Sequence, residues 1–375
     1  MSGISHDEVT PRLAPQMADY DRLSGQIDWR PYLMYFQPPN FVSGAVTTDR
    51  FGFRPAIDHT GRRVTIDDAQ TETVSLVVGN SVSFGVGATS DARSLTSRIA
   101  SHTGDCWLNF SGRAFGAMQE LVLFQSYRHK LGRVRRVILL TGLNDFYLFY
   151  APKMFDDIFG IFFFSEAFYG AMNRRPQALS SKRALLAALL RPFYGEDIDY
   201  AAVSLAQLPG LLMRRRSSRK RQIAPEPDYP ALVAERREHR GRIIDHLART
   251  LEIWAVLAHG LGFELTYMLQ PILPWTGKAL SPEERELLAA QDAAGGRWHP
   301  ILRAALDDDH HRWYTAALAG LCARFGIPFV DLGVEMRDDP RWLFIDRVHM
   351  NDAGQDLAAR LVSHHCGSRQ TFARA

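Results

Sequence analysis

Five short apolar segments recur along the chain, and stretches with a helical pattern separate them. They are VSLVV at 74–78, CWLNF at 106–110, RVILLT at 136–141, FELTYML at 263–269 and IPFVDL at 327–332. Short continuous apolar runs are typical of strands that are buried on both faces. Strands that alternate with helices form a parallel sheet covered by helices on both sides. The sequence therefore predicts an α/β fold around a five-stranded parallel sheet.

Two regions stand outside this alternation. Residues 1–70 mix aromatic residues, prolines and charges, and we expect an N-terminal extension that packs on the domain of residues 71–375. Residues 146–235 interrupt that domain as a helical and aromatic insertion. Eleven aromatic side chains lie between Phe146 and Tyr169, and the basic stretch RRRSSRKR follows at 214–221. This basic stretch has little to bury, so we expect it to form a solvated loop.

Charge, cysteine content and the distribution of apolar residues indicate which partners and which cellular compartment to expect. A formal net charge of +3 is small for 375 residues, and no nucleic-acid-binding motif is visible, so we expect no nucleic-acid partner. The three cysteines are widely spaced, which is typical of a reducing compartment. The first residues lack the pattern of a signal peptide, and no apolar run reaches the about 18 residues of a membrane-spanning helix. We therefore expect a cytoplasmic protein without stable membrane insertion, and its oligomeric state stays open.

In parallel sheets, functional residues gather at the carboxyl ends of the strands. The first apolar run ends on Gly79, Asn80 and Ser81. A serine at a strand-to-helix turn can expose its hydroxyl, and the free N–H groups of a helix start can stabilise a developing anion. Gly85 and Gly87 follow, and we expect them to keep the approach to the serine open.

Two other interpretations of this turn compete with a nucleophilic serine. The turn can be an ordinary loop in which the serine only caps a helix. The glycines can also cradle a phosphate, but Ser90 stands where a dinucleotide fingerprint needs its third glycine. The phosphate cradle is the weaker of the two alternatives, because the strand ends well before Gly85.

Candidate oxyanion donors follow the second and third apolar runs. The second run is followed by NFSGRAFG, which holds Asn109, Gly112, Ala114 and Gly116. The third is followed by TGLND, which places Gly142, Asn144 and Asp145 at the same sheet edge. An asparagine amide and backbone N–H groups near Ala114 are neutral donors suited to an oxyanion, although a strand-terminal asparagine is also common in turns.

A candidate base follows the fifth apolar run. Asp346 and His349 lie three residues apart in FIDRVHMNDAGQ, just before a predicted helix. Serine is a poor nucleophile at its own pKa and needs a base such as a histidine oriented by a carboxylate.

The four segments together resemble the SGNH (GDSL-type) hydrolase family. The blocks of that family read roughly Gly-Asp-Ser, an Asn/Gly stretch, Gly-x-Asn-Asp and Asp-x-x-His, and here they are GNSVSFGVG, NFSGRAFG, GLND and DRVH. The resemblance covers most of 72–145 and 236–365. It implies a three-layer α/β/α domain of the flavodoxin-like SGNH type.

The resemblance also implies roles for single residues. Ser81 would be the nucleophile, His349 the base and Asp346 its orienting acid. The oxyanion hole would comprise Asn144 and the backbone N–H groups of Ser81 and Ala114. The supporting loop positions are Gly79, Asn80 and Gly142.

Two residues depart from the pattern of the family. Asn80 replaces the usual aspartate before the nucleophile, and it keeps a hydrogen-bonding side chain without the charge. Ala114 stands where the family commonly has a glycine, and its N–H can donate provided that the backbone needs no positive φ. Ser83, two residues after Ser81, is interpreted as support for the loop.

The resulting functional hypothesis is a serine esterase that cleaves an O-acetyl or other short acyl ester of a sugar or small metabolite. The alternatives are an acyltransferase with the same triad and an inactive SGNH domain used as a binding module. No cofactor is expected, and the acidic stretch DDDHH at 307–311 is interpreted as solvated or helix-capping rather than metal-binding. We expect the aromatic part of 146–169 to line one wall of the Ser81 pocket. WRPY at 29–32 and RFGFR at 50–54 can contact substrate or serve as packing.

Overall fold

The computed structural model describes residues 6–151, 162, 163, 186, 189, 190, 206, 228–294 and 298–367. The chain divides into two compact units. The first comprises Met1–Ile161 and Tyr229–Ala375, and the second comprises Phe162–Asp228. Most of the second unit, including the basic stretch 214–221, lies outside the described residues, so the fold and site below belong to the first unit.

A five-stranded parallel sheet forms the centre of the first unit, in the order β6-β5-β7-β8-β9. The strands are β5 (Thr73–Gly79), β6 (Trp107–Ser111), β7 (Arg133–Thr141), β8 (Glu264–Leu269) and β9 (Phe329–Asp331). Each predicted apolar run forms one of these strands, and the prediction of a parallel sheet is confirmed. Strand β5 is buried from its second residue to its last. It shows no alternation of buried and exposed side chains, because both faces of the sheet are covered.

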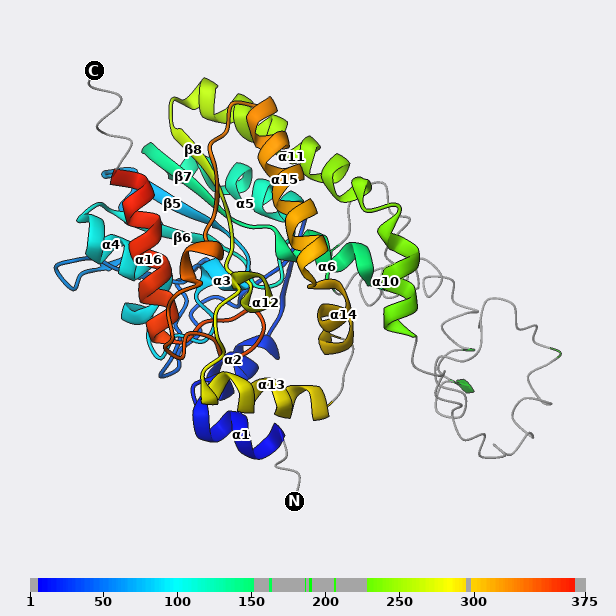
Figure 1. Cartoon of the computed structure of the whole chain (residues 1–375). Coiled ribbons are helices and arrows are strands. Elements are labelled where there is room, and N and C mark those ends of the chain that lie inside the picture. The colour runs from blue at the N-terminus through cyan, green and yellow to red at the C-terminus, as the bar shows by residue number, and fades with distance from the viewer. Residues whose placement is uncertain are drawn as a thin grey trace. The chain divides into compact units, whose positions relative to one another are not determined.

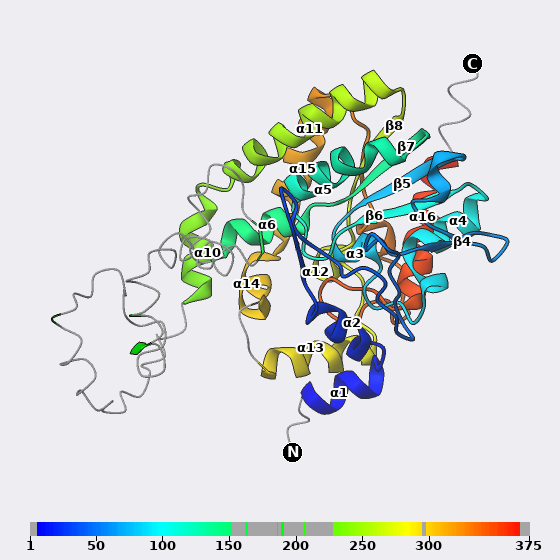
Figure 2. The ribbon, with the colours of Figure 1, turned by 180° about the vertical axis from the view of Figure 1, so that it is seen from behind.

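Helices cover both faces of the sheet, which gives the predicted three-layer α/β/α architecture (Figure 1, Figure 2). On one side α16 packs against α4, and on the other α11 packs against α5 and α15. These helices are α4 (Leu95–Thr103), α5 (Ala117–Tyr127), α11 (Gly241–Leu261), α15 (Asp308–Arg324) and α16 (Asp352–Gly367). After the N-terminal segment, the other described α-helices of this unit are α3 (Ser81–Phe84), α6 (Leu143–Tyr150), α10 (Tyr229–Arg237), α12 (Leu273–Thr276), α13 (Pro282–Ala294) and α14 (Trp298–Ala305). Within the described ranges, none of the helices has the length and apolar character needed to cross a membrane.

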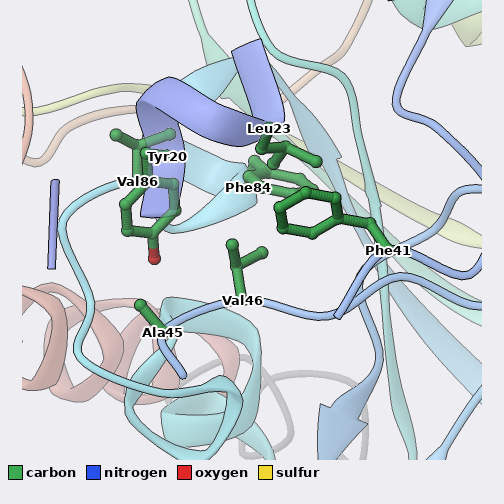
Figure 3. Close-up of a cluster of buried hydrophobic side chains, with 7 residues drawn as sticks. All are labelled: Tyr20, Leu23, Phe41, Ala45, Val46, Phe84 and Val86. Carbon is green, nitrogen blue, oxygen red and sulfur yellow. The ribbon is translucent and has the colours of Figure 1, made fainter. Parts of the chain in front are cut away.

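The N-terminal segment contains short regular elements. They are the helices α1 (His6–Leu13) and α2 (Met17–Ser24), and two small antiparallel pairs, β1 (Asp28–Arg30) with β2 (Met34–Phe36) and β3 (Ala56–Ile57) with β4 (Arg63–Val64). One buried cluster joins this segment to α3 and the residues just after it, as Figure 3 shows. It comprises Tyr20, Leu23, Phe41, Ala45 and Val46 from the segment, Phe84 at the end of α3, and Val86.

Arg54 belongs to the same contact, and its side chain has no exposed surface. Its guanidinium donates to the carbonyl oxygens of Phe84 at 3.2 Å and Gly85 at 2.9 Å, and it pairs with Asp91 at 2.8 Å. A buried cation needs such partners, because desolvation without them is strongly unfavourable. Arg54 of the RFGFR segment is therefore a packing residue that fixes the end of α3.

We predict that Arg54→Ala lowers the free energy of unfolding by about 3–5 kcal/mol, because it leaves buried carbonyl groups and Asp91 without their partner. The matched control is Arg50→Ala in the same RFGFR segment. The Arg50 side chain is 64% exposed and pairs with Asp67 at the surface, so its loss changes stability by at most about 1 kcal/mol. Urea unfolding followed by circular dichroism measures both, and equal effects of the two substitutions would contradict the prediction.

Candidate active site

The four predicted segments meet at the carboxyl edge of the sheet. Ser81 is the first residue of α3, directly after β5. Ala114 lies in the loop between β6 and α5, and Asn144 lies in the first turn of α6 after β7. Asp346 and His349 lie in the loop before α16.

Ser81, His349 and Asp346 form a continuous hydrogen-bonded chain. His349 Nε2 lies 2.9 Å from Ser81 Oγ, and His349 Nδ1 lies 2.6 Å from Asp346 Oδ2. The other carboxylate oxygen, Asp346 Oδ1, accepts hydrogen bonds from the backbone N–H groups of Val348 and His349, both at 2.6 Å. A neutral imidazole with its proton on Nδ1 can accept the Ser81 hydroxyl proton at Nε2, which is the geometry of a serine nucleophile with its base.

The Asp346 carboxylate is stabilised in its charged form. Burial alone would raise its pKa, but the charge and ring hydrogen bond of His349 and the two backbone N–H donors together lower the pKa of Asp346 below its usual value. Asp346 is therefore ionised at neutral pH and fixes which ring nitrogen of His349 carries the proton.

Direct contacts hold the segment that follows Ser81, up to Gly87, against the loop before α16 that contains His349. Gly87 has a φ of +97°, and a Cβ there would lie 2.4 Å from the carbonyl oxygen of Met350. The buried Gln355 side chain donates to the carbonyl oxygens of Val86 and Met350, each at 3.2 Å. The two loops therefore approach as closely as their backbones allow.

This packing corrects the expectation that Gly85 and Gly87 keep an approach to Ser81 open. A Cβ on Gly85 would lie 3.0 Å from Ser94 Cβ and 3.2 Å from an Arg54 nitrogen, and Gly87 faces Met350. Both glycines have positive φ values, +89° and +97°, and both are needed for close packing of protein on protein.

Asn80 caps the helix that begins at Ser81. Its Oδ1 accepts from the Val82 N–H at 3.0 Å, and its Nδ2 donates to Gln270 Oε1 at 2.5 Å. The side chain is completely buried, so both hydrogen bonds matter for its orientation. Sequence reasoning did not identify Gln270, although it directly follows β8 and is the first polar residue beyond that apolar run.

Gly79 and Ser83 support the same turn. A Cβ on Gly79 would lie 2.2 Å from the Leu140 carbonyl oxygen and 2.4 Å from Ser83 Oγ, so only glycine fits at the end of β5. The fully buried Ser83 donates to the Asn80 carbonyl oxygen at 3.0 Å. Ser83 is therefore a structural hydroxyl that supports the loop, as predicted from the sequence.

Ala114 adopts the left-handed backbone conformation, with a φ of +57°. The backbone at position 114 therefore has the positive φ that stands against an alanine donor, and an N–H donor here requires alanine to hold a conformation that favours glycine. A residue with a Cβ is strained in this region by roughly 1 kcal/mol, whereas glycine is not. Its neighbour Phe115 accepts a hydrogen bond at its carbonyl oxygen from Asn144 Nδ2 at 2.7 Å. This bond uses one of the two amide hydrogens of Asn144 and orients the other.

Two carboxyl groups, those of Asp145 and Glu120, lie at the start of α5, which follows the loop that contains Ala114. Asp145 accepts from the Ala117 N–H, which lies 3.1 Å from each of its oxygens, and it pairs with His246 at 3.3 Å. Glu120 is buried and accepts from Thr141 Oγ1 at 2.6 Å. Burial, followed by the nearby charge of Asp145, holds the pKa of Glu120 well above its usual value.

Gly142 begins the turn into α6 with a φ of +123°, and its carbonyl oxygen accepts from Tyr314 Oη at 2.8 Å.

The aromatic side chains that follow in α6 are buried. Phe146 packs edge-on or tilted against Tyr150, Trp275 and Tyr314, with ring centroids 5.0, 5.3 and 5.2 Å apart. The remaining aromatic positions up to Tyr169, apart from Phe162 and Phe163 of the second unit, lie outside the described residues. The pocket-wall hypothesis therefore stays a prediction.

The acidic stretch 307–311 belongs to the start of α15. Asp307 is the N-cap, and its side chain accepts from the His310 N–H at 2.7 Å. His311 Nε2 lies 2.7 Å from Asp331 Oδ2. The predicted capping role is confirmed, and the described part of the chain holds no group of three or more His, Cys, Asp or Glu side chains that could hold a metal ion.

Comparisons with known proteins give matches among solved structures alone. No protein-family model matches the chain, and no curated protein matches it. A phospholipase A1 from Streptomyces albidoflavus is 12% identical with a TM-score of 0.37, over 78% of this chain and 98% of its own. An extracellular lipase from Streptomyces rimosus is 14% identical with a TM-score of 0.34, over 79% and 99%. The acetyl xylan esterase AlAXEase is 8% identical with a TM-score of 0.35, over 77% and 97%.

We predict that Asn80→Ala lowers the free energy of unfolding by about 1–2 kcal/mol, because the Val82 N–H loses its cap and Gln270 Oε1 loses the shorter of its two hydrogen bonds. Asn80→Asp is the matched control, since aspartate keeps the cap. Gln270 Nε2 has no partner among the described residues, so this amide can turn to donate to the new carboxylate, and only the 3.5 Å contact of Gln270 Oε1 with the Leu143 N–H is lost. Urea unfolding of both variants tests the prediction, and an Asn80→Asp variant as unstable as Asn80→Ala would contradict it.

Proposed function

We propose that the protein is a serine hydrolase of the SGNH type that cleaves acyl esters through an acyl-Ser81 intermediate. The observation that carries the proposal is the hydrogen-bonded chain from Ser81 Oγ through His349 to Asp346, with distances of 2.9 and 2.6 Å. A module that only binds a ligand has no need for a histidine held between a serine hydroxyl and a carboxylate.

In the proposed acylation step, His349 Nε2 takes the proton of Ser81 as Oγ attacks the ester carbonyl carbon. The carbonyl π electrons move onto oxygen and form a tetrahedral oxyanion. When the oxyanion collapses, the bond to the alcohol oxygen breaks, and His349 gives its proton to this leaving oxygen. Asp346 stays ionised and stabilises the imidazolium that forms between these two transfers.

Deacylation repeats the sequence with water. His349 takes a proton from the water molecule, the water oxygen attacks the acyl carbon, and a second oxyanion forms. The Ser81 Oγ–carbon bond then breaks, and Ser81 regains its proton from His349. The net reaction converts ester and water to carboxylic acid and alcohol, and the residues return to their initial state.

The proposed oxyanion donors are the backbone N–H groups of Ser81 and Ala114 and the Nδ2 amide of Asn144. Ser81 starts a helix, and Asn144 is held by its bond to the Phe115 carbonyl oxygen. Donors fixed before the reaction stabilise the developing charge without reorganisation, and the loss of one such donor typically lowers kcat by about 10²–10³-fold.

The proposed substrate is an ester with an O-acetyl or other short acyl group on a sugar or small metabolite. The side chains proposed at the reaction centre itself, Ser81, Ala114 and Asn144, are small or polar. None of these side chains offers a long acyl chain an extended apolar surface.

Product analysis in the presence of a panel of alcohol acceptors distinguishes hydrolysis from acyl transfer. Release of free acid alone supports hydrolysis, and an acylated acceptor supports transfer.

We predict that Ser81→Ala lowers the rate of p-nitrophenyl acetate hydrolysis by roughly 10⁴-fold or more, because no other group forms the acyl-enzyme. The variant should also fail to react with a fluorophosphonate probe. The control is Ser83→Ala, which removes the neighbouring buried hydroxyl and should keep both reactions. A Ser81→Ala variant with the wild-type rate would refute the assignment.

We predict that Asp346→Asn lowers kcat by roughly 10²–10⁴-fold with little change in KM, because the uncharged amide no longer stabilises the imidazolium. The Oδ1 atom of the amide still accepts from the Val348 and His349 N–H groups, so the loop should keep its shape. Steady-state kinetics, together with thermal unfolding, provide the measurement. Activity within about threefold of wild type would show that the carboxylate has no part in the reaction.

A further inference from the structure

The loop that contains Ala114 is attached to the N-terminal segment at several points. Gln37 Nε2 donates to the Ser111 carbonyl oxygen at 3.2 Å, and Gln119 Nε2 donates to the Leu33 carbonyl oxygen at 3.1 Å. Arg113 donates to the Leu23 carbonyl oxygen at 3.0 Å. These bonds bracket Ala114 on both sides along the chain.

Tyr35 makes the contact at Ala114 itself. Its hydroxyl donates to the Ala114 carbonyl oxygen at 2.5 Å. The Tyr35 ring is 4% exposed and packs edge-on against Phe115, with ring centroids 5.7 Å apart and an interplanar angle of 75°. Burial raises the pKa of Tyr35, so the hydroxyl keeps its proton and remains a donor.

The carbonyl groups of two successive peptides, 114–115 and 115–116, are therefore held by hydrogen bonds. Tyr35 holds the oxygen of Ala114, and Asn144 holds the oxygen of Phe115. The Phe115 N–H also donates to the Gly112 carbonyl oxygen at 3.2 Å, which closes the turn around Ala114. With the turn closed and the Ala114 carbonyl held, Ala114 keeps its φ of +57° although it is not glycine. Return to negative φ requires rotation of the peptide that carries the Ala114 N–H, or separation of the Ala114 carbonyl from Tyr35.

We propose that Tyr35 is a positioning residue that holds Ala114 in the left-handed conformation and thereby directs the Ala114 N–H toward the oxyanion. The inference rests on the proposed serine-hydrolase function. A glycine at position 114 would adopt the left-handed conformation without support. Because position 114 is alanine, the N-terminal segment supplies that support through the hydrogen bond of Tyr35.

The first test is Tyr35→Phe, which removes the hydroxyl and keeps the ring. We expect kcat to fall about 10- to 100-fold and KM to change by less than about twofold, because an oxyanion donor acts mainly in the transition state. The matched control is Tyr127→Phe. Tyr127 Oη accepts from Arg30 of the same N-terminal segment at 2.8 Å but does not contact Ala114, and kcat should stay within about twofold of wild type.

The decisive test is rescue by glycine. Glycine occupies the left-handed region without strain, so Ala114→Gly alone should be close to wild type, and Tyr35→Phe with Ala114→Gly should recover kcat to within about threefold of wild type. A purely structural role of Tyr35 in packing would not be rescued by this change. If Tyr35→Phe alone does not fold, the double variant decides, since its activity supports the proposal and its inactivity overturns it.

A crystal structure of Tyr35→Phe gives a readout that does not depend on activity. We expect Ala114 at negative φ in this variant. A retained positive φ, an unchanged kcat in Tyr35→Phe, or a lowered kcat without rescue by Ala114→Gly would each overturn the proposal. Failure of the proposed function would give a different result. The wild-type protein would then show no Ser81-dependent hydrolysis, whereas the φ of Ala114 would still change in Tyr35→Phe.

Discussion

The hydrogen bond between Ser81 and His349 joins residues that lie 268 positions apart in the chain. It forms only because the loop after β5 and the loop before α16 pack backbone on backbone, at Gly87 and Met350. Gln355 then bridges the two loops with one side-chain amide. A displacement of about 1 Å between a nucleophile and its base can lower activity by about 100-fold, so this packing is the constraint on which the candidate site depends.

The N-terminal segment contributes to both sides of the same site. Arg54 fixes the carbonyl groups at the end of the short helix that starts with Ser81. Tyr35 reaches the opposite loop and contacts Ala114. A segment of irregular sequence thus orders the two loops that a parallel sheet by itself leaves free at its edge.

The strands and the order of the site residues could be predicted from the sequence, because each depends on local pattern. A buried strand shows as an apolar run, and the carboxyl-edge rule places Ser81, Asn144 and His349 near one another. Gln270, Tyr35 and Arg54 depend on contacts between distant segments, which leave no periodic signal. The left-handed backbone at Ala114 has one signal in the sequence, the glycine that is common at this position of the SGNH pattern, whereas the contacts that impose this conformation on an alanine leave none.

A crystal structure of the protein after reaction with a fluorophosphonate tests the central claim most directly. The account predicts a covalent bond from Ser81 Oγ to phosphorus, with a phosphoryl oxygen about 2.7–3.1 Å from the Ser81 N–H, the Ala114 N–H and Asn144 Nδ2. His349 Nε2 should remain within hydrogen-bond distance of the Ser81 oxygen. An adduct on another residue, or a phosphoryl oxygen turned away from these donors, would contradict the account.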